Sequence, residues 1–485
     1  MLDRAFVRGI AWLGGVKWAV QMVNWVITIV VARMLTPQDY GLLSMASVLL
    51  AFITLLGESG IGTTVVTIRQ LTREQTAQIN GAAALFGAVS FAVACLAAVP
   101  VGRFYSAPGL PPVIMALSLT LLIVPFRIVP GALLQRDMRF RPIAIIDGAQ
   151  GLIQGLTTLI LAWLGFRYWS LVGGALIGAL VGTGATLVAR PHPLRFPRWE
   201  TLRPVLPFTR EVFLTRVCWY AYANADFIIA GRRLGVLALG AYSYAWTLAS
   251  IPVDKITGLL GGVAPSVFAA VQKDRVALGR FFLTVTEGLA IIAFPLTIGL
   301  AFVARDFVGV VFGPPWRVMI LPLQVLALYA SVRTITPIAA QVLTAAGDTR
   351  FQMYQSAIAA IGLPVAFYVG SRWNTLGIAV AWAIAHPLFI YFPLNARVLR
   401  RLDLSVMRYL QALWPAVSAC FLMGGAVAIA RYVVPLTHGR HIRLTAEVLS
   451  GMIAYLISLL LLHRERLRRF LRVWLSPAQD AALER

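Results

Sequence analysis

Charged residues are scarce in this chain. They make up only 13% of its 485 residues, whereas 59% are hydrophobic, and a soluble domain is normally about a quarter charged. So few charges cannot cover a surface in water, and most of the apolar surface must therefore face lipid. The sequence predicts an all-α membrane protein instead of a set of soluble domains.

Cysteines are also few, and none has the spacing of a metal or redox site. Cys95, Cys218 and Cys420 fall in apolar segments, which argues against a disulfide framework or a zinc site. The sequence has no glycine-rich loop ending in Gly-Lys, no His-Glu-x-x-His and no Cys-x-x-Cys. We therefore expect no enzyme chemistry, no ATP-driven motor, no cofactor and no metal.

Apolar segments long enough to cross a bilayer recur along the chain, and each needs roughly 20 residues. Their number is predicted as about fourteen. We expect them at 9–33, 40–58, 80–101, 111–131, 142–164, 168–188, 209–231, 236–258, 278–303, 318–345, 352–371, 375–395, 409–435 and 444–462. A polar, proline-rich stretch at 190–200 is expected in water or at the lipid headgroups.

The net charge of +23 comes almost entirely from arginine. These arginines lie in short stretches between apolar segments, which is typical of the positive-inside rule and not of a nucleic-acid surface. Placing both termini in the cytoplasm gives a bias of roughly two to one towards the inside. The arginines assigned to the outside are Arg33, Arg103, Arg167, Arg232, Arg233, Arg305, Arg317, Arg372, Arg431, Arg440 and Arg443.

The chain contains an internal repeat. At an offset of 199 residues, five positions of the stretch 32–46 are identical to those of 231–245, including Gly41 with Gly240. Later in each half, the Asp-x-Arg-Phe of 137–140 matches that of 348–351 at an offset of 211. The first and second sets of six segments are thus predicted to be two copies of one unit, related by an axis along the membrane normal.

This repeat predicts the domain organisation. We expect a first lobe at 1–189, a cytoplasmic linker at 190–208 and a second lobe at 209–398. Two further membrane helices should occupy 399–463, and a basic, amphipathic cytoplasmic tail 464–485.

Polar and ionisable residues inside apolar segments are costly and normally face a cavity or a partner. Lys17, with Gln21 and Asn24 on the same helix face, and Arg216 occupy equivalent positions of the two copies. Such a pair of cations suits a phosphate or diphosphate group. The alternative is that both side chains extend to the headgroups. Arg333 lies in mid-segment, which favours a cavity.

The acids Asp147, Asp226 and Glu287 also fall within apolar segments. Each could bind a coupling ion, although pairing with a nearby arginine is the simpler expectation. Arg127 and Arg210 lie closer to segment ends and are expected at the headgroups. His386 is expected to be a packing residue.

Four stretches resemble the polysaccharide transporter, or oligosaccharide flippase, family of the multidrug, oligosaccharidyl-lipid and polysaccharide exporter superfamily. They are ARMLTPQDYGL at 32–42, GESGIG at 57–62 with the residues up to 70, LQRDMRF at 134–140 and ADFIIAG at 225–231. The resemblance is strongest to the branch that exports colanic-acid-like exopolysaccharides.

This resemblance implies two six-helix lobes, a central cationic cavity and alternating access. The implied substrate is an undecaprenyl-diphosphate-linked oligosaccharide, moved from the cytoplasmic to the periplasmic leaflet of a bacterial inner membrane. Membrane lipids and a polysaccharide polymerase with its export machinery are the other expected partners. The family's arginine-lined cavity would correspond to Lys17, Arg216 and Arg333 here, and a lysine departs from that pattern.

Three other functions fit a many-helix chain less well. A cation-coupled drug antiporter would need acids to dominate the cavity, and here cations outnumber them. A flippase for the peptidoglycan precursor would show a Ser-Arg signature in its first loop. A glycosyltransferase or polymerase would need a long loop with paired acids, and no loop is long enough.

Overall fold

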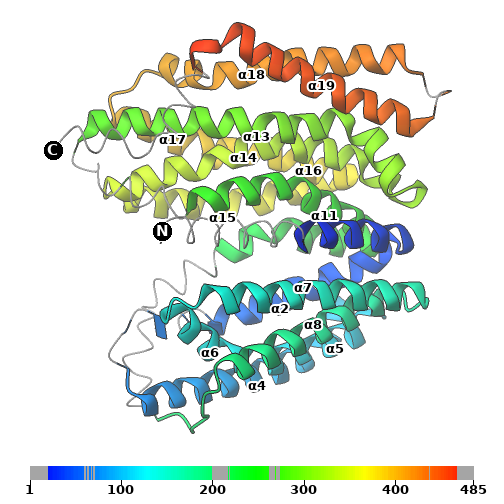
Figure 1. The fold of residues 1–485 in the computed structure, drawn as a ribbon, viewed down its shortest axis with the longest axis vertical. Helices are drawn as coiled ribbons and strands as arrows, with labels where there is room; N and C mark the ends of the chain where they lie inside the picture. The colour runs from blue at the N-terminus through cyan, green and yellow to red at the C-terminus, as the bar shows by residue number, and fades with distance from the viewer. Residues whose placement is uncertain are drawn as a thin grey trace, which may run out of the picture. The chain divides into compact units, whose positions relative to one another are not determined.

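The computed structural model describes residues 20–58, 62, 65–66, 68, 71–198, 217, 219–261, 268, 274–435, 437 and 439–466. Every regular element in these residues is a helix, which confirms the all-α prediction (Figure 1). The chain divides into two compact units, Met1–Ala241 and Tyr242–Arg485.

Ten helices in the described ranges are long and apolar enough to cross a membrane, or eleven if the bent pair Leu110–Ile123 and Pro125–Arg136 forms one span. One of these, Arg350–Arg401, is 52 residues long. It contains a turn at 371–374, and the helices on either side of that turn pack against each other. The total of fourteen stays a prediction.

The first unit is built from α2 (Pro37–Glu58), α4 (Arg73–Phe104), α5 (Leu110–Ile123), α6 (Pro125–Arg136), α7 (Phe140–Trp163) and α8 (Tyr168–Ala189). A shorter apolar helix, Val20–Met34, precedes them. The α7 and α8 helices pack along each other, as do α4 and α5. The bend of 41° between α5 and α6 occurs at Pro125, which lacks the backbone N–H that would continue the helix.

The α11 helix (Ala225–Gly261) is broken at Gly235, whose φ is 84°. This left-handed conformation suits glycine, because a Cβ would be strained there. The break falls between the two segments expected at 209–231 and 236–258. Ahead of the break, the Tyr220 hydroxyl donates to the Val48 carbonyl oxygen of α2, and Gly231 lies against the Tyr105 ring. These contacts join residues 220–234 to the first unit.

Two glycines aligned by the repeat lie against each other's helices. A Cβ on Gly41 in α2 would collide with the Val236 carbonyl oxygen, and one on Gly240 in α11 would collide with the Pro37 carbonyl oxygen. The latter Cβ would also lie 2.8 Å from the Gly41 nitrogen. Because Pro37 and Val236 are separated by the same 199 residues, the two copies meet in a reciprocal contact of the kind a twofold axis produces.

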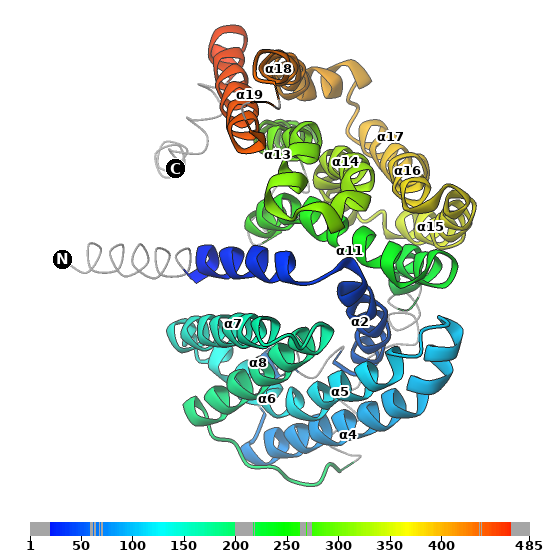
Figure 2. The same ribbon diagram turned by 90° about the vertical axis from the view of Figure 1, so that its right-hand side faces the viewer.

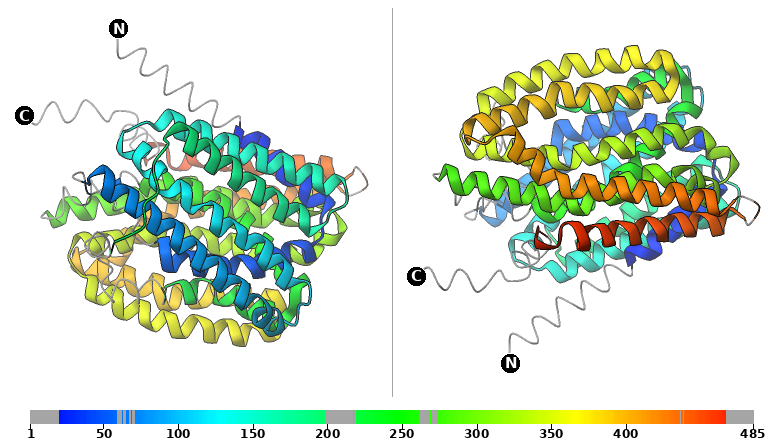
Figure 3. Two further views of the ribbon diagram at one scale, coloured as in Figure 1. Left: turned by 90° about the horizontal axis from the view of Figure 1, so that it is seen from below. Right: turned by 90° about the horizontal axis from the view of Figure 1, so that it is seen from above.

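The second unit begins within α11, at Tyr242. Its other elements are α13 (Arg275–Val311), η1 (Pro314–Met319), α14 (Ile320–Ala345), α15 (Thr349–Gly370), η2 (Ser371–Trp373), α16 (Asn374–His386), η3 (Pro387–Tyr391), α17 (Phe392–Arg401), α18 (Val406–Val433) and α19 (Arg440–Leu462). The α18 and α19 helices lie side by side and both pack on α13 (Figures 2 and 3). The Tyr455 hydroxyl secures this contact by donating to the Ile291 carbonyl oxygen at 2.7 Å.

The second repeated motif has a structural counterpart in each unit. Asp137, in the turn after α6, lies 3.1 Å from Arg190 just beyond α8. Asp348, in the turn after α14, lies 2.6 Å from Arg397 and 3.4 Å from Arg401 in α17. In both units, the aspartate therefore links the turn that follows the fourth predicted segment of the repeat (α6 or α14) to the end of its sixth segment (after α8, or in α17). This shared ion pair accounts for the Asp in both Asp-x-Arg-Phe motifs.

Candidate functional site

The charged residues inside apolar helices define the candidate site. Of these, Lys17 and Arg216 lie outside the described residues, and the cationic pair that they form stays a prediction. Asn24 is described, and its side chain faces α7, where a Cβ on Gly151 would lie 3.1 Å from its nitrogen. Its oxygen is buried without a hydrogen-bond partner in the described part of the chain.

Arg333 in α14 contacts three residues of α11. Its Nη1 donates to the Ser250 hydroxyl at 2.7 Å, and its Nη2 lies 3.7 Å from an Asp254 carboxylate oxygen. The guanidinium carbon lies 4.8 Å from the centre of the Trp246 ring, a cation–π geometry. The Arg333 side chain is 30% exposed. With five N–H donors in the group, several remain available to an anion.

Aromatic residues continue from Trp246 along the same region of the second unit. Trp382 lies 5.1 Å from Trp246 and 5.5 Å from Tyr329, measured between ring centres. His386 is buried, with its ring 5.2 Å from Tyr329. His386 thus packs among aromatic rings as expected, but its Nδ1 has no hydrogen-bond partner in the described part of the chain.

A second arginine centre occupies the first unit. Arg127 in α6 lies 3.2 Å from Asp147 and donates to the Gln150 side chain, both in α7. Arg127 and Asp147 line a cavity of about 290 Å³ with Thr186 of α8. Asp147 thus has the arginine partner considered from the sequence. The expectation that Arg127 extends to the headgroups stays a prediction.

The other two acids lie away from these centres. Asp226 is fully buried at the start of α11. Glu287 in α13 lies 3.3 Å from Arg466, which also donates to the Gln411 carbonyl oxygen. Among the residues that the structure describes, no group of three or more His, Cys, Asp or Glu side chains could hold a metal ion.

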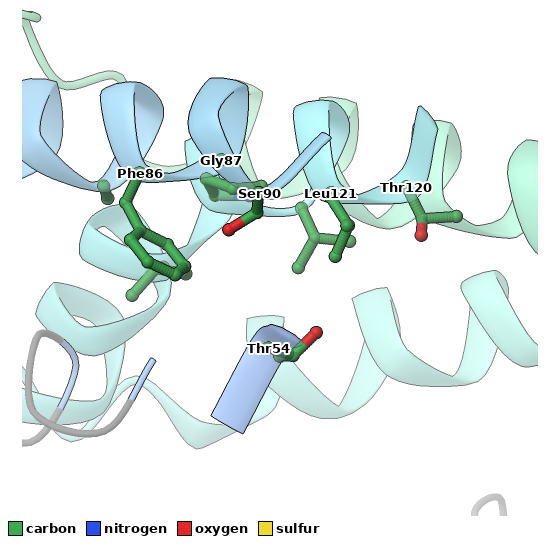
Figure 4. Close-up of a pocket in the computed structure, with 10 residues that line it drawn as sticks. Thr54, Phe86, Gly87, Ser90, Thr120 and Leu121 are labelled. Atoms are coloured by element: carbon green, nitrogen blue, oxygen red, sulfur yellow. The ribbon is translucent and has the colours of Figure 1, made fainter. Parts of the chain in front are cut away.

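A further cavity of about 230 Å³ lies between α2, α4 and the α5–α6 bend (Figure 4). Its lining includes Thr54, Phe86, Ser90, Thr120 and Leu121 but no ionisable residue. This cavity cannot supply the charges that a phosphate group requires.

Basic residues surround a cavity of about 490 Å³ beside the start of α4, where residues 190–198 follow α8. Arg73, Arg136, Arg190 and His192 line it. The segment is fixed along α4 because the backbone N–H of Arg195 donates to the Ala77 carbonyl oxygen. Burial, followed by the charges of Arg190 and Arg73, lowers the pKa of His192 below its usual 6.5, so this imidazole is neutral at pH 7.

Comparison with known proteins identifies the family. The family model described as "Polysaccharide biosynthesis protein" matches residues 30–321, more than half of the chain. The chain belongs to this family. It is a multi-pass membrane protein with a transporter fold.

Individual relatives align along most of their length. The chain is 24% identical to succinoglycan biosynthesis transport protein ExoT of Rhizobium meliloti, covering 96% of this chain and 95% of the relative. It is 24% identical to lipopolysaccharide biosynthesis protein WzxC of Escherichia coli, with 79% of each covered. For teichuronic acid biosynthesis protein TuaB of Bacillus subtilis the identity is 23%, over 87% and 88%.

Solved structures share the fold. The lipid II flippase MurJ in an inward closed conformation superposes with a TM-score of 0.73 at 12% identity, covering 93% of this chain and 99% of MurJ. An inward-facing transporter of the multidrug resistance MATE family gives 0.61 at 12% identity, over 80% and 98%. These likenesses place the chain in the same fold as both transporter families.

Proposed function

We propose that this protein is a flippase for lipid-linked oligosaccharides. It moves undecaprenyl-diphosphate-linked repeat units from the cytoplasmic to the periplasmic leaflet of a bacterial inner membrane by alternating access. Both termini lie in the cytoplasm, as the distribution of arginine indicates. Membership of the polysaccharide biosynthesis family and the transport role in the name of a relative aligned over nearly its full length support this function.

The observation that carries the proposal is the environment of Arg333. A half-buried guanidinium stacked on Trp246 and hydrogen-bonded to Ser250 is pre-oriented, so little conformational entropy is lost when it binds an anion. Asp254 is 65% exposed and 3.7 Å away, so it neutralises the charge only weakly. Arg333 therefore suits a diphosphate headgroup, together with Lys17 and Arg216 as predicted from the repeat.

The neighbouring aromatic rings suit the carbohydrate. Flat apolar faces such as those of Trp246 and Trp382 can pack against the C–H faces of sugar rings, as amphipathic aromatic side chains do at many binding surfaces. Asp147, Asp226 and Glu287 are assigned to ion pairing or coupling within the helices, and no cofactor takes part.

The test uses cells that lack this protein and accumulate the lipid-linked repeat unit. Spheroplasts are treated with a sugar-specific lectin that cannot cross the membrane, and the accessible fraction of the lipid-linked unit is measured. Wild type should expose the unit at the outer face. Arg333→Gln should reduce the rate at which the unit reaches the outer face by about tenfold or more. Arg333→Lys should keep only part of the wild-type rate, because lysine lacks the bidentate fork.

Arg372→Gln is the matched control, because Arg372 is also an arginine within the second unit but is exposed in a turn. It should transport like wild type. The proposal fails if the unit reaches the outer face at the same rate without the protein. It also loses its structural basis if Arg333→Gln transports like Arg372→Gln.

A further inference from the structure

Five arginines gather at one end of the second unit, where α13 and α18 end and α19 begins. They are Arg305, Arg317, Arg431, Arg440 and Arg443. The sequence assigns this end to the outer side of the membrane, where basic residues are normally depleted. Nearly half of all the arginines predicted on that side are concentrated here, so the cluster requires a local explanation.

Buried acids account for two of the five. Arg431 donates from Nε to Glu447 at 2.8 Å and from Nη2 to the Phe302 carbonyl oxygen. The Nε of Arg443 lies 3.2 Å from Asp306 and 3.3 Å from Glu447. Both carboxylates are buried and need these cations. Arg431 and Arg443 are therefore explained by the packing of α13, α18 and α19.

The other three are not explained by pairing. Arg305, Arg317 and Arg440 are exposed, and none makes an ion pair with the described residues. Together with Arg443 they line a cavity of about 250 Å³, whose only acid is Asp306. Asp306 is already contacted by Arg443 through Nε, so the cavity is lined by three arginines that lack an ion pair among the described residues, beside one neutralised carboxylate. Such an excess of positive charge favours an anionic ligand.

Gly309 in α13 makes room for one of these groups. A Cβ at this position would lie 2.9 Å from Nη1 of Arg440. The bare backbone therefore admits the Arg440 guanidinium to the cavity, and a larger residue would displace it. The cavity is thus shaped by the sequence at an uncharged position as well as at the arginines.

We propose that this cavity binds the phosphate group of a lipid headgroup in the outer leaflet. Arginine forks hold phosphate oxygens in bidentate geometry, and basic pockets between membrane helices bind anionic headgroups. Small-molecule pockets usually exceed about 300 Å³, so this smaller space fits a headgroup and not an oligosaccharide. Val318, Leu321 and Ile442, next to the lining residues, are exposed hydrophobic side chains that acyl chains can cover.

Two lipids supply this chemistry, an anionic phospholipid of the bulk membrane and a polyprenyl diphosphate. The binding site is independent of the proposed flippase activity, because its evidence lies entirely in the α13–α14–α19 region. The experiment therefore measures binding directly, on the purified full chain in detergent, by native mass spectrometry with added tetraoleoyl cardiolipin or undecaprenyl diphosphate. Phosphatidylcholine, which carries no net charge, is the reference lipid.

Arg317→Gln/Arg440→Gln should weaken binding of at least one of the two phosphate lipids about tenfold or more relative to wild type. Gly309→Val should weaken it without removing a charge, and Arg317→Lys/Arg440→Lys should retain only part of it, because lysine keeps the charge but lacks the bidentate fork. Arg372→Gln, an exposed arginine predicted on the same side, should bind like wild type. The melting temperature of each variant shows that it is folded.

Loss of cardiolipin binding alone identifies the bulk phospholipid as the ligand, and loss of undecaprenyl diphosphate binding alone identifies the polyprenyl lipid. If both lipids bind the double glutamine variant as tightly as wild type, the proposal is wrong. Equal weakening by Arg372→Gln would also overturn it, because binding would then follow overall charge and not this cavity.

Discussion

Gly41 and Gly240 occupy equivalent positions of the two repeats and each lies against the backbone of the other's helix. A methyl group on either would meet a carbonyl oxygen that belongs to a helix backbone, not a side chain that could turn away. The contact is therefore closed to any residue except glycine. A substitution of either glycine should therefore lower the stability of the protein measurably.

Gly240→Val should destabilise the protein by about 1–3 kcal/mol, the usual cost of forcing extra atoms into a packed contact. Gly258→Val provides the control on the same helix, because nothing lies within 4 Å of a Cβ there. Thermal unfolding of the two purified variants makes the comparison. Equal melting temperatures would show that α2 and α11 do not approach as described.

Asp348→Asn should lower stability more than Asp137→Asn, because the Asp348 side chain is 8% exposed and that of Asp137 is 36% exposed. The hydrogen bond from Arg397 holds the pKa of Asp348 below its usual 3.8. Its stabilisation is therefore present above about pH 4 and is lost as the pH falls further towards the lowered pKa.

Melting temperatures of wild type and Asp348→Asn at pH 7, 5 and 3.5 measure this effect. The difference between them should be constant from pH 7 to 5 and should shrink at pH 3.5. A difference that grew with acid would have the wrong sign for a carboxylate stabilised in its ionised form.

His192→Gln should make the protein less sensitive to mild acid. The pKa of His192 is lowered in the folded state by burial and by Arg190 and Arg73, so protons bind the unfolded chain preferentially below pH 6.5. Wild type should lose stability between pH 7.5 and 5.5, and the variant should lose less. His441→Gln, at an exposed histidine, should behave like wild type in the same thermal assay.

Asp147→Asn should show whether Asp147 only forms an ion pair with Arg127 or also binds a coupling ion during transport. The Asp147 side chain is 57% exposed, and an ion pair of that kind contributes at most about 1 kcal/mol. The melting temperature should therefore change little. If Asp147 only pairs with Arg127, transport should also be nearly unchanged at every pH and sodium concentration; a loss of pH or sodium dependence in the lectin assay would assign it to coupling.

The helices and the repeat could be predicted because both depend on local patterns. Apolar length marks the spans, and glycine and Asp-x-Arg-Phe identities mark equivalent positions. The partners of Asp137 and Asp348 could not be predicted, since Arg190 and Arg397 lie some fifty residues later in the chain and only the fold brings them together. The alignment of Asp137 with Asp348 in the repeated motif nevertheless indicated that the two acids have equivalent roles.

The candidate site could be predicted from the sequence only in part. Position in mid-segment was enough to select Arg333, but its contacts with Ser250 and Trp246 depend on how α11 packs against α14. Arg127 was expected at the headgroups because it lies near a segment end, and its contacts with Asp147 and Gln150 could not be predicted because those residues come from α7. The arginine cavity at α19 was missed altogether, since its lining residues come from four separate elements and were counted only as charges outside the membrane.

The reciprocal glycine contact also bears on how a duplicated gene can diverge. Because the two repeats meet here through main-chain atoms, only the glycine in each must be kept while the surrounding side chains change independently. Substitutions elsewhere in either repeat then leave the approach of α2 to α11 intact.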